Sequence, residues 1–190
     1  MQQSDLTQSK TLGADIRAIR KARGLTLAEV AARLACSVGW LSQVERDLSV
    51  PSVTDLRQLA DVLGVPVSML FARKPAPAEE EGHVVRKGAR RTIGSREAGL
   101  VEELLSPDLT DDFEVVHSTF LPHSEIAEFV MRPTQEVGYL ISGKLDLWIA
   151  GRKFTIHPSD SFRIRGEKHR WANPYDNPAV AIWVIAPPVY

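Results

Sequence analysis

The period at which apolar residues recur changes once along this chain of 190 residues, and the change limits the folds open to it. Before residue 74 they return every three or four positions, the period of an amphipathic helix. After residue 82 they alternate with polar residues in short runs rich in β-branched and aromatic side chains, which is typical of strands. The segment between, KPAPAEEEG, has the composition of a solvated linker. The sequence therefore predicts a flexible tail at 1–9, a helical domain at 10–73, a linker at 74–82 and a β domain at 83–190.

Residues 25–47, LTLAEVAARLACSVGWLSQVERD, are predicted to form two short helices joined by a tight turn. Thr26 and Glu29 have the spacing of a capping box, and Ser37 can cap the second helix. Period alone does not separate a helix-turn-helix from an ordinary helical hairpin. The apolar positions keep a spacing of three or four in both helices: Leu27, Val30, Ala31 and Leu34, then Leu41, Val44 and Leu48.

Three further helices are predicted around this pair. The first begins at Leu12 and ends near Gly24, and a short last helix covers 67–71 after Pro66. Another begins after the cap residue Ser52, ends at Gly64, and carries Val53, Leu56, Leu59, Ala60 and Leu63. The sequence thus predicts five short helices in this domain.

Residues 12–71 resemble the Cro/C1, or xenobiotic-response-element (XRE), family of helix-turn-helix domains. The LSQVER core, the P-S-x-x-x-L opening of the fourth helix and the L-G-V-P turn stand at the spacing of that family. The resemblance implies a five-helix, lambda-repressor-like bundle that binds double-stranded DNA as a dimer, with an ion pair between Arg20 and Glu45. Asp47 stands where the family usually has glycine, at a site expected to need a positive φ. Leu27 replaces a glutamine that often contacts phosphate.

By the same resemblance, the second helix of the pair reads the DNA. Gln43 can contact adenine through two hydrogen bonds, and the small, uncharged start of the helix can approach base edges closely. Trp40 is either a DNA contact or a core residue. The expected DNA-binding residues are Ser37, Val38, Gly39, Trp40, Ser42, Gln43, Arg46, Ser49 and Ser52.

Composition agrees with a cytoplasmic protein. The chain has one cysteine, which excludes an internal disulfide, and its formal net charge is −1. No apolar run approaches the roughly 18 residues of a membrane span, and the polar start is unlike a signal peptide. We therefore expect no membrane contact. Near-neutral charge predicts modest non-specific affinity for DNA, so specificity would depend on base contacts and paired half-sites.

The β domain is predicted to contain short strands separated by turn residues. The expected strands are 83–86, 100–104, 114–120, 138–141, 144–149, 153–156, 161–165, 169–172 and 180–185. Many short strands at regular spacing indicate a sandwich or a small barrel.

Residues 136–174 resemble the cupin family, whose fold is an all-β jelly-roll barrel, the double-stranded β-helix. The first family motif keeps Glu136 and a Y-L-x-S-G-x-L-x-L run, and the second keeps Pro158, Asp160, His169 and Asn173. The resemblance covers about residues 112–187. With the helical domain, it implies an α + β protein of two domains.

Many cupins hold a divalent metal through two histidines and the glutamate of the first motif and a histidine of the second. Here the positions before Glu136 hold Phe129, Met131 and Arg132, so only Glu136 and His169 remain. Two ligands beside an arginine make a poor cation site unless His117 or His123 joins them. The sequence therefore predicts no metal, no cofactor and no enzymatic activity.

We expect the interior of the barrel to bind a small polar molecule instead. Arg163 and Arg165 share one face of a strand. If that face is the interior they can bind a carboxylate or phosphate, and if it is the outside they are solvated surface or the rim of a dimer. The expected ligand-binding residues are Glu136, Tyr139, Trp148, Arg163, His169 and Trp171.

Together the two resemblances imply a bacterial transcriptional regulator of the XRE type, expected to act as a repressor. It would bind a pseudo-palindromic operator as a homodimer, and an effector such as an amine, amino acid or peptide would bind the cupin domain and alter operator binding. Two alternatives remain: a metal-dependent cupin enzyme with a DNA-binding head, and a cupin that serves only to dimerise the chain.

Overall fold

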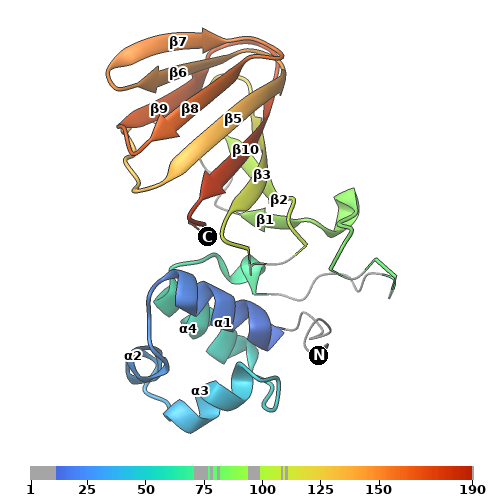
Figure 1. Cartoon of the computed structure of the whole chain (residues 1–190), viewed down its shortest axis with the longest axis vertical. Coiled ribbons are helices and arrows are strands. Elements are labelled where there is room, and N and C mark those ends of the chain that lie inside the picture. The colour runs from blue at the N-terminus through green and yellow to red at the C-terminus, as the bar shows by residue number, and fades with distance from the viewer. Residues whose placement is uncertain are drawn as a thin grey trace, which may run out of the picture. The chain divides into compact units, whose positions relative to one another are not determined.

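The computed structural model describes residues 12–70, 77, 79–80, 82–93, 99–107, 109 and 111–189 (Figure 1). The chain divides into a helical unit, 1–89 with 107–110 and 190, and a β unit, 90–106 with 111–189. The expected tail at 1–9 and most of the expected linker lie outside the described residues. The domain boundaries expected from the sequence stay a prediction. No helix of the described part is long and apolar enough to cross a membrane.

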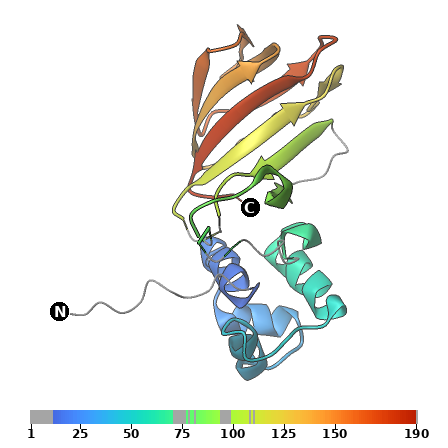
Figure 2. The same cartoon turned by 90° about the vertical axis from the view of Figure 1, so that its right-hand side faces the viewer.

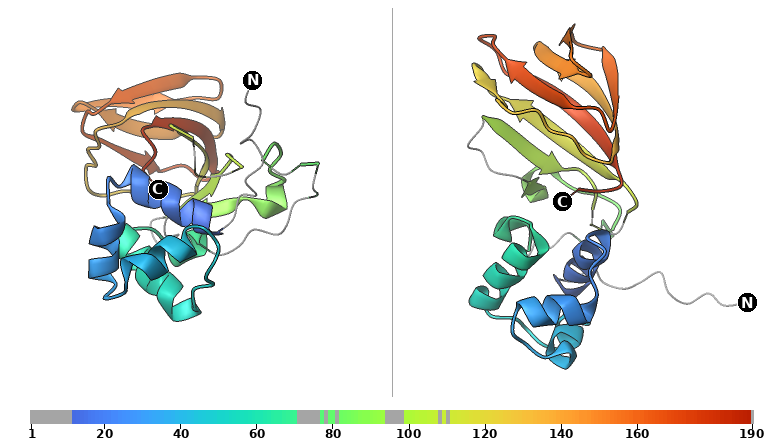
Figure 3. Two further views of the ribbon diagram at one scale, coloured as in Figure 1. Left: turned by 60° about the horizontal axis from the view of Figure 1, so that its bottom comes forward. Right: turned by 90° about the vertical axis from the view of Figure 1, so that its left-hand side faces the viewer.

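The helical unit contains α1 (Leu12–Ala22), α2 (Leu27–Arg33), α3 (Val38–Val44) and α4 (Val53–Leu63) (Figure 3). The predicted caps are confirmed: Thr26 and Glu29 form a capping box, and Ser37 and Ser52 cap α3 and α4. These caps satisfy amide groups that the first turn of a helix leaves without a partner. The core is built from side chains exposed by at most 1%: Ile16, Ile19, Val30, Leu41, Val44, Leu59 and Leu63.

The expectation of five α-helices is wrong. The fifth segment is a single 3₁₀ turn, Val67–Met69, in which the amide of Met69 donates to Pro66 O at 2.9 Å. Pro66 fixes its start, and so short a segment closes i→i+3 bonds in place of an α-helical turn.

Two residues of the expected apolar stripes are exposed, and two others, Leu27 and Leu34, are half-buried. Leu48 is 69% exposed and Val53 55% exposed. The helical period no longer applies to Leu48, because α3 ends at Val44 and the chain turns at Asp47, where φ is 57°. Val53 occupies the first position of α4, before the helix turns its apolar side inward.

The β unit is a sandwich of two antiparallel sheets (Figures 1 and 2). The six-stranded sheet has the order β1-β2-β3-β10-β5-β8 and contains β1 (Arg91–Ile93), β2 (Leu100–Leu104), β3 (Glu114–Phe120), β10 (Ala179–Ala186), β5 (Gln135–Ser142) and β8 (Ser161–Arg165). The four-stranded sheet has the order β4-β9-β6-β7 and contains β4 (Ser124–Glu125), β9 (His169–Asn173), β6 (Leu145–Ile149) and β7 (Arg152–Ile156).

Alternation along each strand decides which side chains face the other sheet. In β3 the residues Glu114, Val116, Ser118 and Phe120 are buried while those between them are half-buried. One hydrophobic core joins both sheets, and Phe120 meets Trp171 edge to face with ring centroids 4.8 Å apart. We call the sides that meet in this core the inner faces.

The strand predictions need two corrections. Residues 83–86 are not a strand, and a 3₁₀ turn, Lys87–Ala89, follows them. The sequence missed β1 and β4, which have three and two residues and are too short to show alternation.

Candidate functional site

Helix α3 presents its first turn to solvent. Ser37, Val38, Gly39 and Gln43 are exposed, while Leu41 and Val44 of the same helix are buried in the core. The hydroxyl of Ser37 accepts the amide of Trp40 at 3.0 Å, which fixes the start of the helix. The structure therefore brings together the first six expected DNA-binding positions, Ser37 to Gln43, on one short helix and its N-cap.

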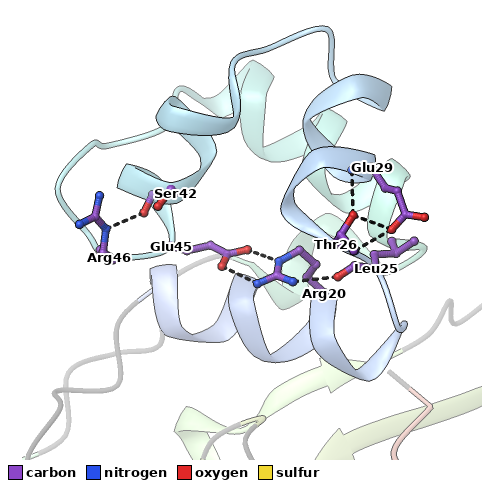
Figure 4. A network of polar contacts seen from close by, with 7 residues as sticks. All are labelled: Arg20, Leu25, Thr26, Glu29, Ser42, Glu45 and Arg46. Atoms are coloured by element: carbon purple, nitrogen blue, oxygen red, sulfur yellow. Dashed lines mark hydrogen bonds and ion pairs between the residues drawn. The ribbon is translucent and has the colours of Figure 1, made fainter.

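A buried ion pair holds α3 against α1 (Figure 4). Arg20 donates from Nε to Glu45 Oε1 at 2.5 Å and from Nη2 to Oε2 at 2.9 Å. Its third nitrogen donates to Leu25 O at 2.8 Å, so the guanidinium also fixes the turn before α2. The predicted ion pair is confirmed. Because it is bidentate, it restricts rotation of α3 more than a single hydrogen bond would.

The turn after α3 depends on Asp47. Its φ of 57° confirms the expected left-handed backbone, and its Oδ1 accepts the amide of Gly13 at 3.0 Å. Gly13 has no room for a side chain, since an added Cβ would lie 2.3 Å from Val44 O. Asp47 thus provides a bond to α1 that glycine could not form.

The other expected DNA contacts lie around this turn. Arg46 is exposed and donates to Ser42 O at 3.1 Å, as Figure 4 shows, and Ser49 is half-buried. The hydroxyl of Ser52 accepts the amide of Asp55 at 3.2 Å as the cap of α4. The hydroxyl of Ser52 is therefore engaged by its own helix.

Trp40 is not a fully buried core residue, and its expected contact with DNA stays a prediction. It is half-buried and lines a cavity of about 290 Å³ together with Leu34, Cys36, Ser37, Asp55 and Gln58. Burial raises the pKa of the Cys36 thiol in the same cavity, which favours its neutral form.

Three glutamates lie on the inner face of the six-stranded sheet, and each accepts a hydrogen bond. Glu102 accepts from Ser118 Oγ at 3.1 Å, Glu114 from the amide of Val189 at 3.3 Å, and Glu136 from Thr134 Oγ1 at 2.6 Å. Pairing places Glu114 beside Ile185, Ile185 beside Glu136, and Glu102 beside Ser118. We call Glu102, Glu114 and Glu136 the carboxylate cluster.

These groups influence one another's ionisation. The pKa of Glu114 is raised to about 7, mainly by burial and also by the nearby charges of Glu102 and Glu136, while the hydrogen bond from Val189 and the charge of Arg132 oppose the shift. Burial also raises the pKa of Glu102, against a hydrogen bond from Ser118 and the charge of Arg132. Arg132 therefore lowers the pKa of two of these carboxyls, Glu102 and Glu114, and its own side chain is exposed.

Three of the six expected ligand-binding residues lie inside the sandwich and three lie on its outer sides. Glu136, His169 and Trp171 are buried on the inner faces. Tyr139 and Arg163 are exposed on the outer side of the six-stranded sheet, and Trp148 lies on the outer side of the other sheet beneath Arg170, whose Cζ is 3.8 Å from its ring centroid. Tyr139, Trp148 and Arg163 are therefore not in the interior, because each occupies the alternate position of its strand. The open question about Arg163 and Arg165 is settled in favour of the outside.

The residues present do not fit the metal site that the cupin fold implies. His117 lies on the outer side of β3, and His123 pairs with Asp176 at 3.1 Å, so neither joins Glu136. In the described part of the chain, no three His, Cys, Asp or Glu side chains are placed to hold a metal ion.

Comparison with known proteins assigns the helical unit to a family. The model of the helix-turn-helix domain family matches residues 11–70. The immunity repressor protein of Bacillus phage phi105 is 30% identical over 129 residues, which cover 67% of this chain and 89% of that protein. The chain belongs to the XRE-type helix-turn-helix family.

The second domain of this XRE-type regulator is a cupin. The cupin domain family matches residues 116–185. An HTH_3 family transcriptional regulator from Vibrio cholerae is 19% identical, with 95% of this chain and 97% of that chain covered and a TM-score of 0.46. The cupin domain of an XRE family transcriptional regulator from Enterobacter cloacae is 25% identical, with 48% and 99% covered and a TM-score of 0.41. The protein is thus a DNA-binding helix-turn-helix regulator with a cupin domain.

Sequence reasoning missed Glu102 and Glu114 of this regulator. Their signal was present, because each stands in an inward register: Glu102 between Leu100 and Leu104, and Glu114 two positions before Val116. A glutamate at an inward position is costly to bury unless it is neutralised or paired, and this marks it as a candidate binding group.

Proposed function

We propose that this protein is a cytoplasmic repressor that binds a two-fold operator as a homodimer and releases or tightens its hold when a small cationic metabolite binds its cupin domain. The observation that carries the DNA-binding part is the exposed first turn of α3, held in place by the ion pair between Arg20 and Glu45. A helix supported in this way can enter the major groove without rearranging its own bundle. The similarity to a phage immunity repressor supports repression as the mode of control.

Base reading is assigned to the exposed residues of α3. Gln43 would contact adenine, and Val38 and Gly39 would approach base edges closely. Arg46, Ser49 and the start of α4 at Ser52 would lie at the DNA backbone. Two copies would place their α3 helices in successive major grooves, about 34 Å apart, on a pseudo-palindrome.

The carboxylate cluster supports an effector that carries positive charge. A bound ammonium group would offset the mutual repulsion of Glu102, Glu114 and Glu136, whereas an anion would add to it. Among the effectors expected from the sequence, amines fit these groups best, and amino acids and peptides would bind through their ammonium ends. Because the residues do not fit a metal, we propose that the cupin domain senses this ligand and catalyses no reaction.

DNA reading is tested with the full chain and an operator selected from random duplexes. Gln43→Ala should weaken operator binding by about 1–3 kcal/mol and leave binding to unrelated DNA almost unchanged, because a lost base contact affects only specific binding. Gln135→Ala, an exposed glutamine of β5 in the cupin domain, is the matched control and should change neither affinity. Equal losses of specific and non-specific affinity in Gln43→Ala would show that α3 does not read the bases.

Ligand sensing is tested by thermal shifts of the full chain with three probes of equal length: 1,4-diaminobutane, succinate and 1,4-butanediol. A ligand present at about 100 times its Kd stabilises the folded state by about 2.7 kcal/mol. We expect a shift with the diamine that Glu102→Gln with Glu114→Gln abolishes. A shift with succinate alone would contradict the cationic effector, and silence with every probe would favour a cupin that serves only to dimerise the chain.

A further inference from the structure

The outer side of the six-stranded sheet is apolar along β10, from Val137 to Ile141 of β5, and at Val115 of β3, whose other outward residues are His117 and Thr119. Val137, Tyr139 and Ile141 of β5 are 49%, 46% and 48% exposed, and Val184 of β10 is 41% exposed. Pairing places Val184 between Val137 and Val115, and Ile182 beside Tyr139. We call Val115, Val137, Tyr139, Ile141, Ile182 and Val184 the outer apolar face.

This face breaks the pattern of a sheet with one side in water. Such a sheet alternates apolar and polar residues, whereas β10 reads AVAIWVIA without a polar residue on either side. The outer side of the four-stranded sheet provides an internal comparison. It carries an ion pair between Lys153 Nζ and Asp146 Oδ2 at 2.8 Å and the cation of Arg170 stacked on Trp148. The outer apolar face therefore has the composition of a buried surface.

Its size suits an interface between proteins. The five strands from β2 to β8 offer a face of about 24 by 23 Å at ordinary strand spacing and rise, on the order of 550 Å² in plan. The accessible area of side chains exceeds their area in plan, and a standard interface buries about 800 Å² on each partner. One sheet stacked on this face would thus bury a standard interface.

We propose that the outer apolar face binds the same face of a second copy, with the two-fold axis parallel to the strands. This inference rests on the proposed function, which requires two DNA-binding domains in one particle. With that axis β10 stacks on the partner's β10, β5 lies over the partner's β3, and β8 lies over the partner's β2. The outward residues of β10 then cover one another, Val137 lies over the partner's Val115, and Tyr139 lies over the partner's His117. Each contact occurs twice, as an isologous interface requires.

Charges at the borders of the face decide between this axis and one that runs across the strands. Arg163 of β8 lies beside Val137 at one border, and Glu103 of β2 lies beside His117 at the other. An axis along the strands brings Arg163 near Glu103 of the partner subunit, one residue row away and within reach of an arginine side chain. An axis across the strands through the row of Val184, Val137 and Arg163 would bring Arg163 over Arg163 of the partner subunit, and like charges would repel. Glu103 already accepts Arg90 Nη1 at 3.2 Å, so the new contact would extend an existing pair.

The test is the mass of the full chain in solution, measured by light scattering and sedimentation without DNA or ligand. The wild type should be a dimer, and Val184→Lys should raise the dimer Kd by about a hundredfold or more, because a buried charge without a partner is costly. The matched control is Met131→Lys, since Met131 is 64% exposed and lies outside the outer apolar face. It should leave the dimer intact. Circular dichroism and the melting temperature verify that Val184→Lys is folded.

A charge reversal tests the axis. Arg163→Glu should weaken the dimer about tenfold, and adding Glu103→Arg should restore it. No restoration would overturn the axis along the strands. A dimer unaffected by Val184→Lys, or a wild type that remains monomeric at about 100 μM, would overturn the interface itself and leave the face to another partner.

The outcome is distinguishable from failure of the proposed function. A dimer that Val184→Lys dissociates would support the inference even if no operator or diamine bound. Conversely, a chain that binds operator and diamine but shows no effect of Val184→Lys on its mass would keep the function and refute this interface.

Discussion

Glu114 shows how one buried residue gives the cupin domain a dependence on pH. Its side chain lies in the core-facing register of β3, and its carboxyl accepts only a weak bond of 3.3 Å from Val189 among the contacts described. Burial and the neighbouring carboxylates raise its pKa from 4.5 to about 7. Near neutral pH it therefore exchanges between a neutral acid and a charged carboxylate.

We predict that the folded chain loses stability as pH rises from about 4.5 to 7. In that window folded Glu114 holds a proton that the unfolded chain has released, so the free energy of unfolding falls, by up to about 3 kcal/mol, and then levels off. Thermal melts of Glu114→Gln should show a flatter profile, whereas exposed Glu128→Gln should retain the wild-type slope. Identical profiles in wild type and Glu114→Gln would contradict the raised pKa.

At the scale of elements, β5 and β8 pack closely because Gly138 of β5 has no side chain. An added Cβ at Gly138 would lie 2.1 Å from Cζ of Phe162 on the neighbouring strand. The Phe162 ring in turn meets Trp183 of β10 edge to face at 4.7 Å. Glycine at this position thus allows two aromatic rings to fill the inner face.

We predict that Gly138→Ala destabilises the chain by about 1–3 kcal/mol, the usual cost of overpacking a core, as measured by urea denaturation. Combining it with Phe162→Leu should recover part of the loss, because the smaller side chain vacates the space. The control is Gly88→Ala, where an added Cβ meets nothing within 4 Å. Strictly additive losses in the double variant would refute the steric explanation.

At the scale of the whole molecule, the proposed mechanism connects a reading helix in one unit to a carboxylate cluster in another. Such coupling is a free energy shared by two sites, and thermodynamics makes it reciprocal. A ligand can change DNA affinity only through a different affinity for the DNA-bound and free states.

We predict that saturating operator DNA changes the Kd of 1,4-diaminobutane by the same factor, about 5–150-fold, as the diamine changes the Kd of the operator. Calorimetry with and without operator measures both factors. The variant combining Glu102→Gln and Glu114→Gln should show neither effect. Unequal factors would indicate that the diamine acts on the DNA itself and not through the protein.

The sequence by itself determined the features that depend on local interactions, namely where helices begin and where most strands lie. The caps at Thr26, Ser37 and Ser52 act over three residues, so their spacing predicts where α2, α3 and α4 begin. The strands were predicted for a similar reason, and β2, β3 and β8 have the expected limits. The family motifs placed the DNA-reading residues on α3, whose role in contacting DNA stays a prediction.

Tertiary structure decided what depends on partners distant in sequence. Asp47, in the turn that follows α3, accepts a hydrogen bond from Gly13, 34 residues earlier, and Leu48 beyond this turn is exposed. Which side of a strand becomes the inside depends on how the sheets stack, and Tyr139 therefore faces out although its residue type suits a core. The insertion of β10 between β3 and β5 brings Glu114 and Glu136 into one row, and pairing of β2 with β3 adds Glu102. Alternation could assign each glutamate to a face, but only the strand order could bring the three together.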